Sequence, residues 1–313
     1  MADRQKQPRL RHLTESQQLS KGLIGTLFAD ADSFRRKPVS NVLDGKILGV
    51  LFYESSTRTR HSFESAMLRL GGRYIGTENA RKFSSAVKGE SLEDTIRVVS
   101  GYSDCIVLRH NKTGAASRAA AVSTVPLINA GDGKGQHPTQ ALLDIYTIQK
   151  ELGRLDNFKI ACVGDLASGR TVRSLCYLLG KFDNNIEIIF ISPKNLRIGE
   201  DIKDYLRRNK INFREETDMN AILPYVDIAY MTRIQKERIS PANYKKARGK
   251  YVINMKNFGL LRPEARLMHP LPHKEEIALP SKIVDNDPRV AYIRQAHNGL
   301  YTRMALLSHM LRD

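Results

Sequence analysis

The sequence predicts an α/β protein made of two doubly wound parallel-sheet domains. Its 313 residues exceed the usual size of one domain, which suggests two. Short, nearly continuous apolar segments such as 47–53 are typical of strands buried on both faces of a parallel sheet. They alternate with stretches of helical periodicity, which is typical of a parallel sheet with right-handed crossovers. One helical stripe consists of Phe63, Ala66, Met67 and Leu70.

Two segments of the first half are expected to lie outside this regular structure. Residues 1–14 are polar and basic, and we interpret them as a frayed tail. Residues 79–89 lack apolar anchors, so we interpret them as a surface loop. The elements expected in this half are a helix over 18–34, strands over 47–53, 73–76, 105–108 and 125–130, a helix that starts at 90–94 and runs through 98–99, and an alanine-rich helix over 115–121.

The second half repeats the alternation of strands and helices and is expected to join the first near a helix over 138–151. The glycines of 164–169 do not have the G-x-G-x-x-G spacing, so they give only weak support for a dinucleotide site. Pro270 and Pro272 predict a fixed turn that can hold a cis bond. The elements expected here are strands over 158–163, 186–191, 226–231 and 266–268, the last being the final strand, and helices from Arg170, over 201–210 and over 301–311.

The composition, 41% hydrophobic and 27% charged, is ordinary for a soluble globular protein. No apolar run approaches the about 20 residues of a membrane span, and the N-terminus lacks the apolar region of a secretory signal. The three cysteines, Cys105, Cys162 and Cys176, have no spacing typical of a metal site or a disulfide framework. We therefore expect a reducing, cytoplasmic compartment.

The formal net charge of +17 predicts an attraction for polyanions. Two interpretations are open: a nucleic-acid or partner footprint, or scattered lysines and arginines that partly steer small anions to a cleft. The chain has no Trp and no basic block interleaved with aromatic residues, so it lacks a platform for stacking bases. This favours the second interpretation, with small anionic substrates as partners.

Hydroxyl and guanidinium side chains follow the predicted strand over 47–53 directly. Ser56, Thr57, Arg58 and Thr59 lie where this strand turns into a helix, so free backbone N–H groups and the positive end of the helix dipole lie beside them. The pattern favours a phosphate site. The alternative is that Ser56 only caps the helix while the arginine is solvated.

Other polar residues lie at predicted strand ends or helix starts. His137 and Gln140 lie three residues apart, so both project from the same side of a helix start. The alternative is that His137 caps the helix and Gln140 is a polar surface residue. Arg109, Arg170 and Arg233 follow predicted strands, where ligands collect in open α/β sheets. No nucleophile with a neighbouring base and no metal-ligand set occurs in the sequence. The residues therefore suit a reaction in which two anions are held together.

Five motifs, in this order, resemble those of the carbamoyltransferase family: 56–60 (STRTR), 137–140 (HPTQ), 164–171 (GDL with GRT), 233–238 (RIQKER) and 269–272 (HPLP). The last two single out the aspartate carbamoyltransferases, because the ornithine enzymes usually carry Ser-Met-Gly and His-Cys-Leu-Pro there. The resemblance extends over about residues 43–311. It implies a carbamoyl phosphate-binding domain over 1–140 plus 297–313, to which a C-terminal helix returns, and an aspartate-binding domain over 141–296.

The resemblance also implies the activity and the roles of individual residues. The reaction would convert carbamoyl phosphate and L-aspartate to N-carbamoyl-L-aspartate and phosphate, the committed step of pyrimidine synthesis, without a cofactor or metal. The implied catalytic residues are Arg58, Thr59, Lys88, Arg109 and His137. The implied carbamoyl phosphate-binding residues are Ser56, Thr57, Arg58, Thr59, Ser84, Lys88, Arg109, His137, Gln140, Leu271 and Pro272. The implied aspartate-binding residues are Lys88, Arg170, Arg233, Gln235 and Leu271.

The resemblance further implies a homotrimer in which Ser84 and Lys88 reach into a neighbouring subunit's site, with regulatory chains or a larger assembly left open. Two residues depart from the family pattern: Ser55 replaces the usual alanine or proline, and His273 replaces the usual arginine. Two rival functions remain. One is a carbamoyltransferase with a different amine acceptor, and the other is a non-catalytic scaffold that binds polyanions.

Overall fold

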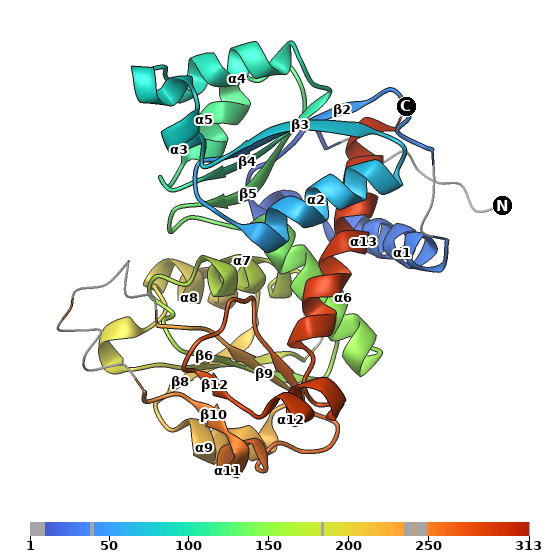
Figure 1. Ribbon diagram of the computed structural model, residues 1–313. Helices are drawn as coiled ribbons and strands as arrows, with labels where there is room; N and C mark the ends of the chain where they lie inside the picture. Colours follow the sequence, from blue (N-terminus) through green and yellow to red (C-terminus); the bar gives the residue numbers. More distant parts are fainter. Residues whose placement is uncertain (1–9, 38–40, 183–184, 235–240, 242–248, 313) are drawn as a thin grey trace. The chain divides into compact units, whose positions relative to one another are not determined.

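The computed structural model describes residues 10–37, 41–182, 185–234, 241 and 249–312, and the chain folds into two compact units. Unit 1 comprises residues 1–142 and 299–313, and unit 2 comprises residues 143–298. The chain passes from one unit to the other within two helices, α6 (Pro138–Leu152) and α13 (Tyr292–Leu311) (Figure 1). Each unit contains one five-stranded sheet in which all neighbouring strands are parallel. The predicted α/β class is confirmed.

The sheet of unit 1 has the strand order β1-β5-β4-β2-β3. Its strands are β1 (His12–Leu13), β2 (Ile47–Phe52), β3 (Arg73–Glu78), β4 (Cys105–His110) and β5 (Leu127–Asp132). Along the chain, β3 is added on one side of β2, and β4 and β5 are added on the other side. Because the crossovers are right-handed, the helix between β2 and β3 covers one face of the sheet, and the helices that follow β3 cover the other. Figure 1 shows α4 (Leu92–Ser100) and α5 (Ala115–Val122) on one face and α2 (Thr57–Arg69) on the other.

The predicted apolar stripe of α2 is the face that packs against the unit 1 core. Phe63, Ala66, Met67 and Leu70 are all fully buried, and the helix ends at Arg69, just before the glycine pair that the sequence offers as a stop. The remaining helical segments of the first half are η1 (Ser16–Gln18), α1 (Lys21–Arg36), α3 (Ala80–Phe83) and η2 (Ser85–Lys88).

The sheet of unit 2 has the order β11-β9-β6-β7-β8, and a separate two-stranded sheet pairs β10 with β12. The strands are β6 (Lys159–Val163), β7 (Glu187–Ile191), β8 (Asn212–Glu216), β9 (Ile228–Met231), β10 (Ile253–Asn254), β11 (Arg266–Met268) and β12 (Ile277–Ala278). The other helical segments are α7 (Arg170–Leu179), η3 (Lys194–Leu196), α8 (Glu200–Arg208), α9 (Met219–Ile222), η4 (Leu223–Tyr225), α11 (Met255–Phe258) and α12 (Ser281–Asn286). In Figure 1, α7 and α8 cover one face of the larger sheet, and α9 covers the other.

The structure corrects several expectations about the first half. The end of the supposed frayed tail forms β1, because Leu13 is fully buried and pairs with Ile128 of β5. The supposed surface loop over 79–89 contains the short helices α3 and η2, whose few apolar residues give no periodic pattern to predict them from. The strand expected over 125–130 lies two residues later, at β5.

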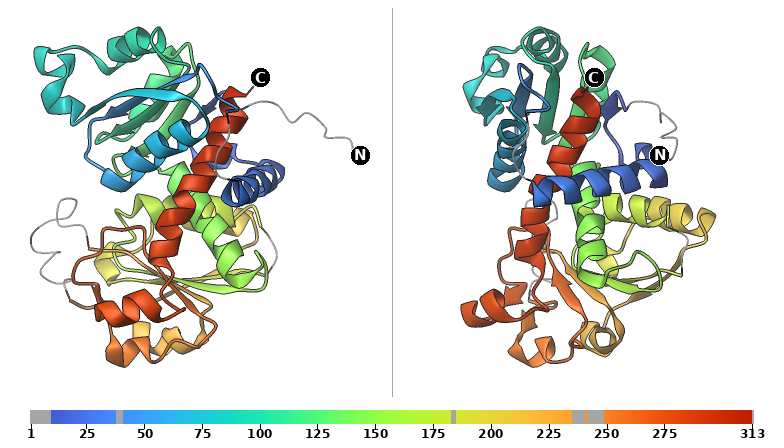
Figure 2. Two further views of the ribbon diagram at one scale, coloured as in Figure 1. Left: turned by 45° about the vertical axis from the view of Figure 1, so that its right-hand side comes forward. Right: turned by 90° about the vertical axis from the view of Figure 1, so that its right-hand side faces the viewer.

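The second half also differs from expectation. The strand at 266–268 is not the last, because β12 follows it, and a two-residue strand is too short to show a period. The edge strand β8 is not predicted, because Phe213 is its only apolar residue and three consecutive charged residues follow, so it shows no apolar run or alternation. The closing helix α13 begins at Tyr292 rather than residue 301, and Figure 2 shows it as one continuous helix. The sequence does not reveal its first turns, because the polar residues Gln295 and Asn298 lie on the buried face and interrupt the apolar period.

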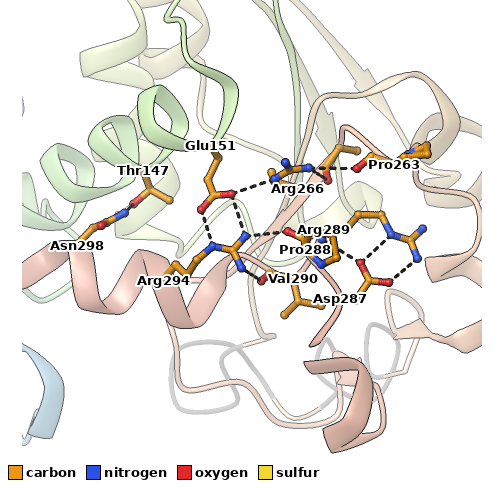
Figure 3. Close-up of polar contacts among 11 residues, drawn as sticks. Thr147, Glu151, Pro263, Arg266, Asp287, Pro288, Arg289, Val290, Arg294 and Asn298 are labelled. Atoms are coloured by element: carbon orange, nitrogen blue, oxygen red, sulfur yellow. Dashed lines mark hydrogen bonds and ion pairs between the residues drawn. The ribbon is translucent and has the colours of Figure 1, made fainter. Parts of the chain in front are cut away.

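Glu151 links α6, α13 and β11 within unit 2 (Figure 3). Its two oxygens lie 2.7 and 2.8 Å from Nε and Nη2 of Arg294, and Oε2 lies 3.0 Å from Nε of Arg266. Arg294 also donates to the carbonyls of Pro288 and Val290. Burial raises the pKa of Glu151, but hydrogen bonds and charge from the two arginines lower it overall. Glu151 is therefore an ionised connector in the folded unit.

We expect Glu151→Gln to lower the free energy of unfolding by about 1–3 kcal/mol at neutral pH, because a charge-assisted pair becomes a weaker one. The folded pKa lies below the ordinary value of 4.5. The stabilisation by the carboxylate is therefore fully present above pH 4.5 and is lost as the pH falls through the folded pKa. Urea unfolding at several pH values measures this difference. The exposed Glu264→Gln serves as control, and an equal deficit at every pH would contradict the assignment.

Candidate active site

Three neighbouring strands of unit 1 end side by side at the carboxyl edge of the sheet. Phe52 of β2 lies opposite Arg109 of β4, and His110 of β4 lies opposite Asp132 of β5. The backbone N–H of Tyr53 continues the ladder to the Arg109 carbonyl at 2.8 Å. Polar residues from three separate stretches of the sequence therefore meet at one edge, as expected for ligand sites of parallel sheets.

The N-terminus of α2 lies at this edge, and its free backbone N–H groups are not capped by the side chain of the N-cap residue. Ser56 occupies the N-cap position, but its side chain makes no capping hydrogen bond, so the alternative role as a side-chain cap is not observed. Thr57 and Arg58 are exposed, while Thr59 is buried. No described residue hydrogen-bonds or pairs with the Arg58 side chain. The arrangement can accept an anion through backbone N–H groups, hydroxyls and a guanidinium fork.

Arg109 is held in place beside this helix end. Its Nη1 donates to the Ala130 carbonyl at 3.2 Å, and its Nη2 lies 3.6 Å from Oε1 of Glu54. Glu54 was not picked out from the sequence, although an acid directly before a donor-rich motif is a usable signal for an arginine partner. These two contacts orient the guanidinium at the carboxyl edge.

His137 and Gln140 occupy the start of α6. The carbonyl of His137 accepts the N–H groups of Gln140 at 3.0 Å and Ala141 at 3.2 Å, so His137 does cap the helix through its backbone. Its Nδ1 lies 3.4 Å from Oγ1 of Thr139. Both His137 and Gln140 are buried, so the alternative of Gln140 as a surface residue is wrong.

A buried network that the sequence did not predict fixes the loop before His137. Asp132 accepts the backbone N–H of Gln136 at 2.9 Å on one oxygen and that of Gly114 at 2.9 Å on the other. The Gln136 side chain in turn accepts the backbone N–H of Ser16 at 2.8 Å. The histidine therefore enters α6 from a loop tied to two other segments of unit 1.

Ser84 lies between α3 and η2, and Lys88 is the last residue of η2. The Ser84 hydroxyl donates to the Ala80 carbonyl at 2.5 Å and accepts the N–H of Ala86 at 3.2 Å. Lys88 is exposed, as are the large apolar side chains of Phe83 and Val87, at 75% and 63%. Lys88 is therefore exposed on unit 1, in the same short segment as two exposed apolar side chains.

Unit 2 builds a corresponding carboxyl edge from β6, β9 and β11. Val163 lies opposite Met231, and Met268 lies opposite Tyr230. Gly164 has φ +122°, and a Cβ there would lie 2.3 Å from the Thr232 carbonyl oxygen, so only glycine fits this close approach.

Arg170 and Arg233 extend from this edge. Arg170 is the first residue of α7 and is 6% exposed, and Asp165 shapes the loop before it by accepting the N–H of Ser168 at 3.0 Å. Arg233 follows β9 and is half-buried. Gln235, expected beside it, lies outside the described residues.

The turn after β11 contains Leu271 and Pro272. The Leu271–Pro272 bond is cis, as the closely spaced prolines allowed, and Leu271 has φ +54°. From the family resemblance of the sequence, we expected the carbonyls of this turn to bind the carbamoyl amide. Among the described residues, no group of three or more His, Cys, Asp and Glu side chains is placed to hold a metal ion.

Two family models together match most of the chain. The carbamoyl-P binding domain of aspartate/ornithine carbamoyltransferases matches residues 11–150, and their Asp/Orn binding domain matches residues 156–310. The chain belongs to the aspartate/ornithine carbamoyltransferase family. The expectation from the sequence motifs is confirmed.

Curated members of the family are similar to this carbamoyltransferase over almost its whole length. The chloroplastic aspartate carbamoyltransferase 3 of Pisum sativum is 52% identical over 95% of this chain and 76% of its own. The aspartate carbamoyltransferase catalytic subunit of Methanocaldococcus jannaschii is 47% identical over 97% of this chain and 99% of its own.

Solved structures of family members share the fold of this carbamoyltransferase. The M. jannaschii catalytic subunit superposes with a TM-score of 0.86 at 46% identity, covering 96% of this chain and 98% of its own. The Trypanosoma cruzi aspartate transcarbamoylase in complex with carbamoyl phosphate and aspartate gives a TM-score of 0.90 at 37% identity, covering 96% and 97%. In the described part of this family member, no helix is long and apolar enough to cross a membrane.

Proposed function

We propose that this carbamoyltransferase transfers the carbamoyl group of carbamoyl phosphate to L-aspartate, giving N-carbamoyl-L-aspartate and phosphate, the committed step of pyrimidine synthesis. The observation that carries the proposal is the N-terminus of α2, where no side chain caps the helix and no described residue pairs with the Arg58 side chain, so both can donate to a tetrahedral anion. The T. cruzi relative, solved with these two substrates, supports it.

Unit 1 supplies most of the groups that bind carbamoyl phosphate, and the Leu271–Pro272 turn of unit 2 supplies the others. The phosphate is held by Ser56, Thr57, Arg58 and Thr59, with Arg109 and the backbone N–H groups of α2, because several donors converge where the helix dipole is positive. Thr59, Arg109 and His137 hydrogen-bond the carbamoyl oxygen, while Gln140 and the carbonyls of Leu271 and Pro272 bind the amide. Ser84 and Lys88 complete the phosphate site.

Unit 2 supplies the groups that bind aspartate. Arg170, Arg233 and Gln235 bind the two carboxylates, since the planar fork of arginine matches carboxylate geometry. Lys88 and Leu271 complete the aspartate site. Two fixed arginine forks select a dicarboxylate over an amine with one carboxylate, and this favours aspartate over another acceptor.

The transfer forms one bond and breaks one. The aspartate amine attacks the carbamoyl carbon, and negative charge develops on the carbamoyl oxygen, where Arg109, His137 and Thr59 stabilise it. The C–O bond to phosphate then breaks, and the departing phosphate takes the proton from the amine. His137 acts as a hydrogen-bond donor rather than a base, and cationic groups offset the repulsion between the substrates.

A colorimetric carbamoyl-aspartate assay on the purified chain tests the proposal against its rivals. Formation of carbamoyl aspartate from carbamoyl phosphate and L-aspartate is expected. Product only with another amine would select a different carbamoyltransferase, and no turnover with any amine would select a non-catalytic scaffold.

We further propose a homotrimer in which Ser84 and Lys88 serve the site of a neighbouring subunit. Support comes from the exposed apolar Phe83 and Val87 beside Lys88, because exposed apolar surface of this kind marks protein–protein contacts. Regulatory chains or a larger assembly are compatible with this trimer. We place the protein in the cytoplasm, while the pea relative is described as chloroplastic.

Mixing two inactive variants tests the shared site. Lys88→Gln and Arg58→Ala should each be inactive as pure trimers. After equal mixing and reassembly, about one site in four combines an intact Arg58 with an intact Lys88 from the neighbour, so about a quarter of wild-type activity should return. The carbamoyl-aspartate assay measures the activity of the mixed trimers. Mixed trimers that remain inactive, or an active monomer in sedimentation, would refute the shared site.

A further inference from the structure

The turn between β11 and β12 adopts a conformation that its own residues disfavour. Leu271 has φ +54°, a left-handed backbone conformation in which the Cβ of a non-glycine residue is crowded. Such a residue persists only where the surrounding structure holds it. The groups that bind this turn therefore determine where its carbonyls lie.

His269 holds the turn through its ring. The backbone N–H of Leu271 donates to Nδ1 of His269 at 2.7 Å. Because Nδ1 accepts a hydrogen bond, the ring proton of the neutral imidazole is on Nε2, and Nε2 lies 3.0 Å from Oε1 of Glu276. His269 and Glu276 are only 2% and 5% exposed, so water does not compete for these bonds.

The backbone of His269 is anchored separately. Its N–H donates to Oε1 of Gln295 on α13 at 2.8 Å, and Nε2 of Gln295 donates to Asp144 on α6 at 2.6 Å. The other oxygen of Asp144 accepts the hydroxyl of Tyr230 at 2.7 Å. The backbone of His269 is therefore fixed independently of its ring, and Glu276 accepts a hydrogen bond from Nε2 of that ring.

We infer that Glu276 is a positioning residue for carbamoyl transfer: through His269 it holds the Leu271–Pro272 turn so that the carbonyls of the turn face the carbamoyl amide. The inference rests on the proposed function, which gives those carbonyls their role. Burial raises the pKa of Glu276, but the hydrogen bond from His269 and nearby backbone N–H groups lower it overall. Glu276 is therefore an anionic acceptor that fixes the tautomer of His269.

Three single variants separate this role from general support of the fold. Glu276→Ala removes the acceptor, and kcat/KM for carbamoyl phosphate should fall roughly 10- to 100-fold, because small misplacements of substrate-binding groups have effects of this size. Glu276→Gln keeps an oxygen for Nε2–H and should restore most of that loss. In His269→Asn, the side-chain oxygen can accept the Leu271 N–H as in an Asx-turn, without Glu276.

The decisive comparison is a double-mutant cycle. If Glu276 acts through His269, Glu276→Ala should have no further effect on kcat/KM in the His269→Asn background. Equal losses in both backgrounds would overturn the inference. If Glu276→Ala alone does not fold, the smaller loss expected for Glu276→Gln takes its place in the cycle, and this loss should likewise disappear in the His269→Asn background. The exposed neighbour Glu275→Ala is the matched control and should behave as wild type.

Hydrogen exchange at the Leu271 amide provides a readout that does not depend on activity. Glu276→Ala should accelerate this exchange while the unfolding midpoint of the protein stays close to that of wild type. An unchanged exchange rate would overturn the inference. A wild-type chain without turnover would instead contradict the proposed function, and the exchange measurement would still decide whether Glu276 holds the turn.

Discussion

Arg58→Ala should reduce turnover by about 10³-fold or more while leaving the fold intact. The guanidinium is proposed to neutralise the phosphate as charge develops on it, and the next arginine of α2, Arg60, is already paired with Glu64 and Glu78. The structural loss should be small because Arg58 is exposed and no described residue pairs with its side chain. Steady-state kinetics with carbamoyl aspartate detection measure the first effect, and urea unfolding measures the second.

Two further variants define what Arg58 contributes. Arg58→Lys keeps the charge but not the planar fork, and it should recover only part of the lost activity. Arg69→Ala, at the exposed end of the same helix, should leave both activity and stability unchanged. Loss of cooperative unfolding in Arg58→Ala would show that the residue is structural, in conflict with its proposed role.

Arg170→Ala should lower kcat/KM for aspartate by about 100-fold, because a bidentate, charge-assisted contact to a substrate carboxylate is lost. Carbamoyl phosphate should bind almost as well as to the wild type, since its proposed phosphate site is in unit 1. Titration calorimetry with carbamoyl phosphate and kinetics at varied aspartate separate the two effects.

Arg173→Ala is the matched control for Arg170. It lies one turn further along α7 and forms an ion pair with Asp201, so it should alter stability but not the KM for aspartate. A similar increase in that KM in both variants would mean that α7 as a whole has shifted. An Arg170→Ala variant that weakened only carbamoyl phosphate binding would contradict the assignment of Arg170 to aspartate.

The local pattern of the sequence predicted the two carboxyl edges well. The apolar run of β2 and the stripe of α2 identify a buried strand followed by a helix, and the polar residues between them must then lie at the carboxyl end of that strand. The same reasoning placed Arg109 at the carboxyl end of β4 and Arg170 at the start of α7. Signals of this kind are readable because they repeat within one or two helical turns.

Contacts between distant residues were not readable in this way. The fully buried Asp144 of α6 joins Gln295 across 151 positions, and the buried polar Gln295 interrupts the apolar period that would have revealed the start of α13. The sequence did not show which arginine Glu54 would meet, because the pairing of β2 with β4 brings Arg109 beside it. Asp132 likewise binds the backbone N–H of Gly114, 18 positions away.

The sequence by itself was enough to predict the α/β class, to identify the carbamoyltransferase motifs and to find the strand ends that carry cationic side chains. These features follow from backbone periodicity and turn chemistry, which are local properties of the sequence. The tertiary structure alone decided which strand ends lie next to each other and which buried acids orient the arginines and histidines. It also decided the left-handed conformation of Leu271. These features depend on hydrogen bonds whose two partners become neighbours only when the sheets form.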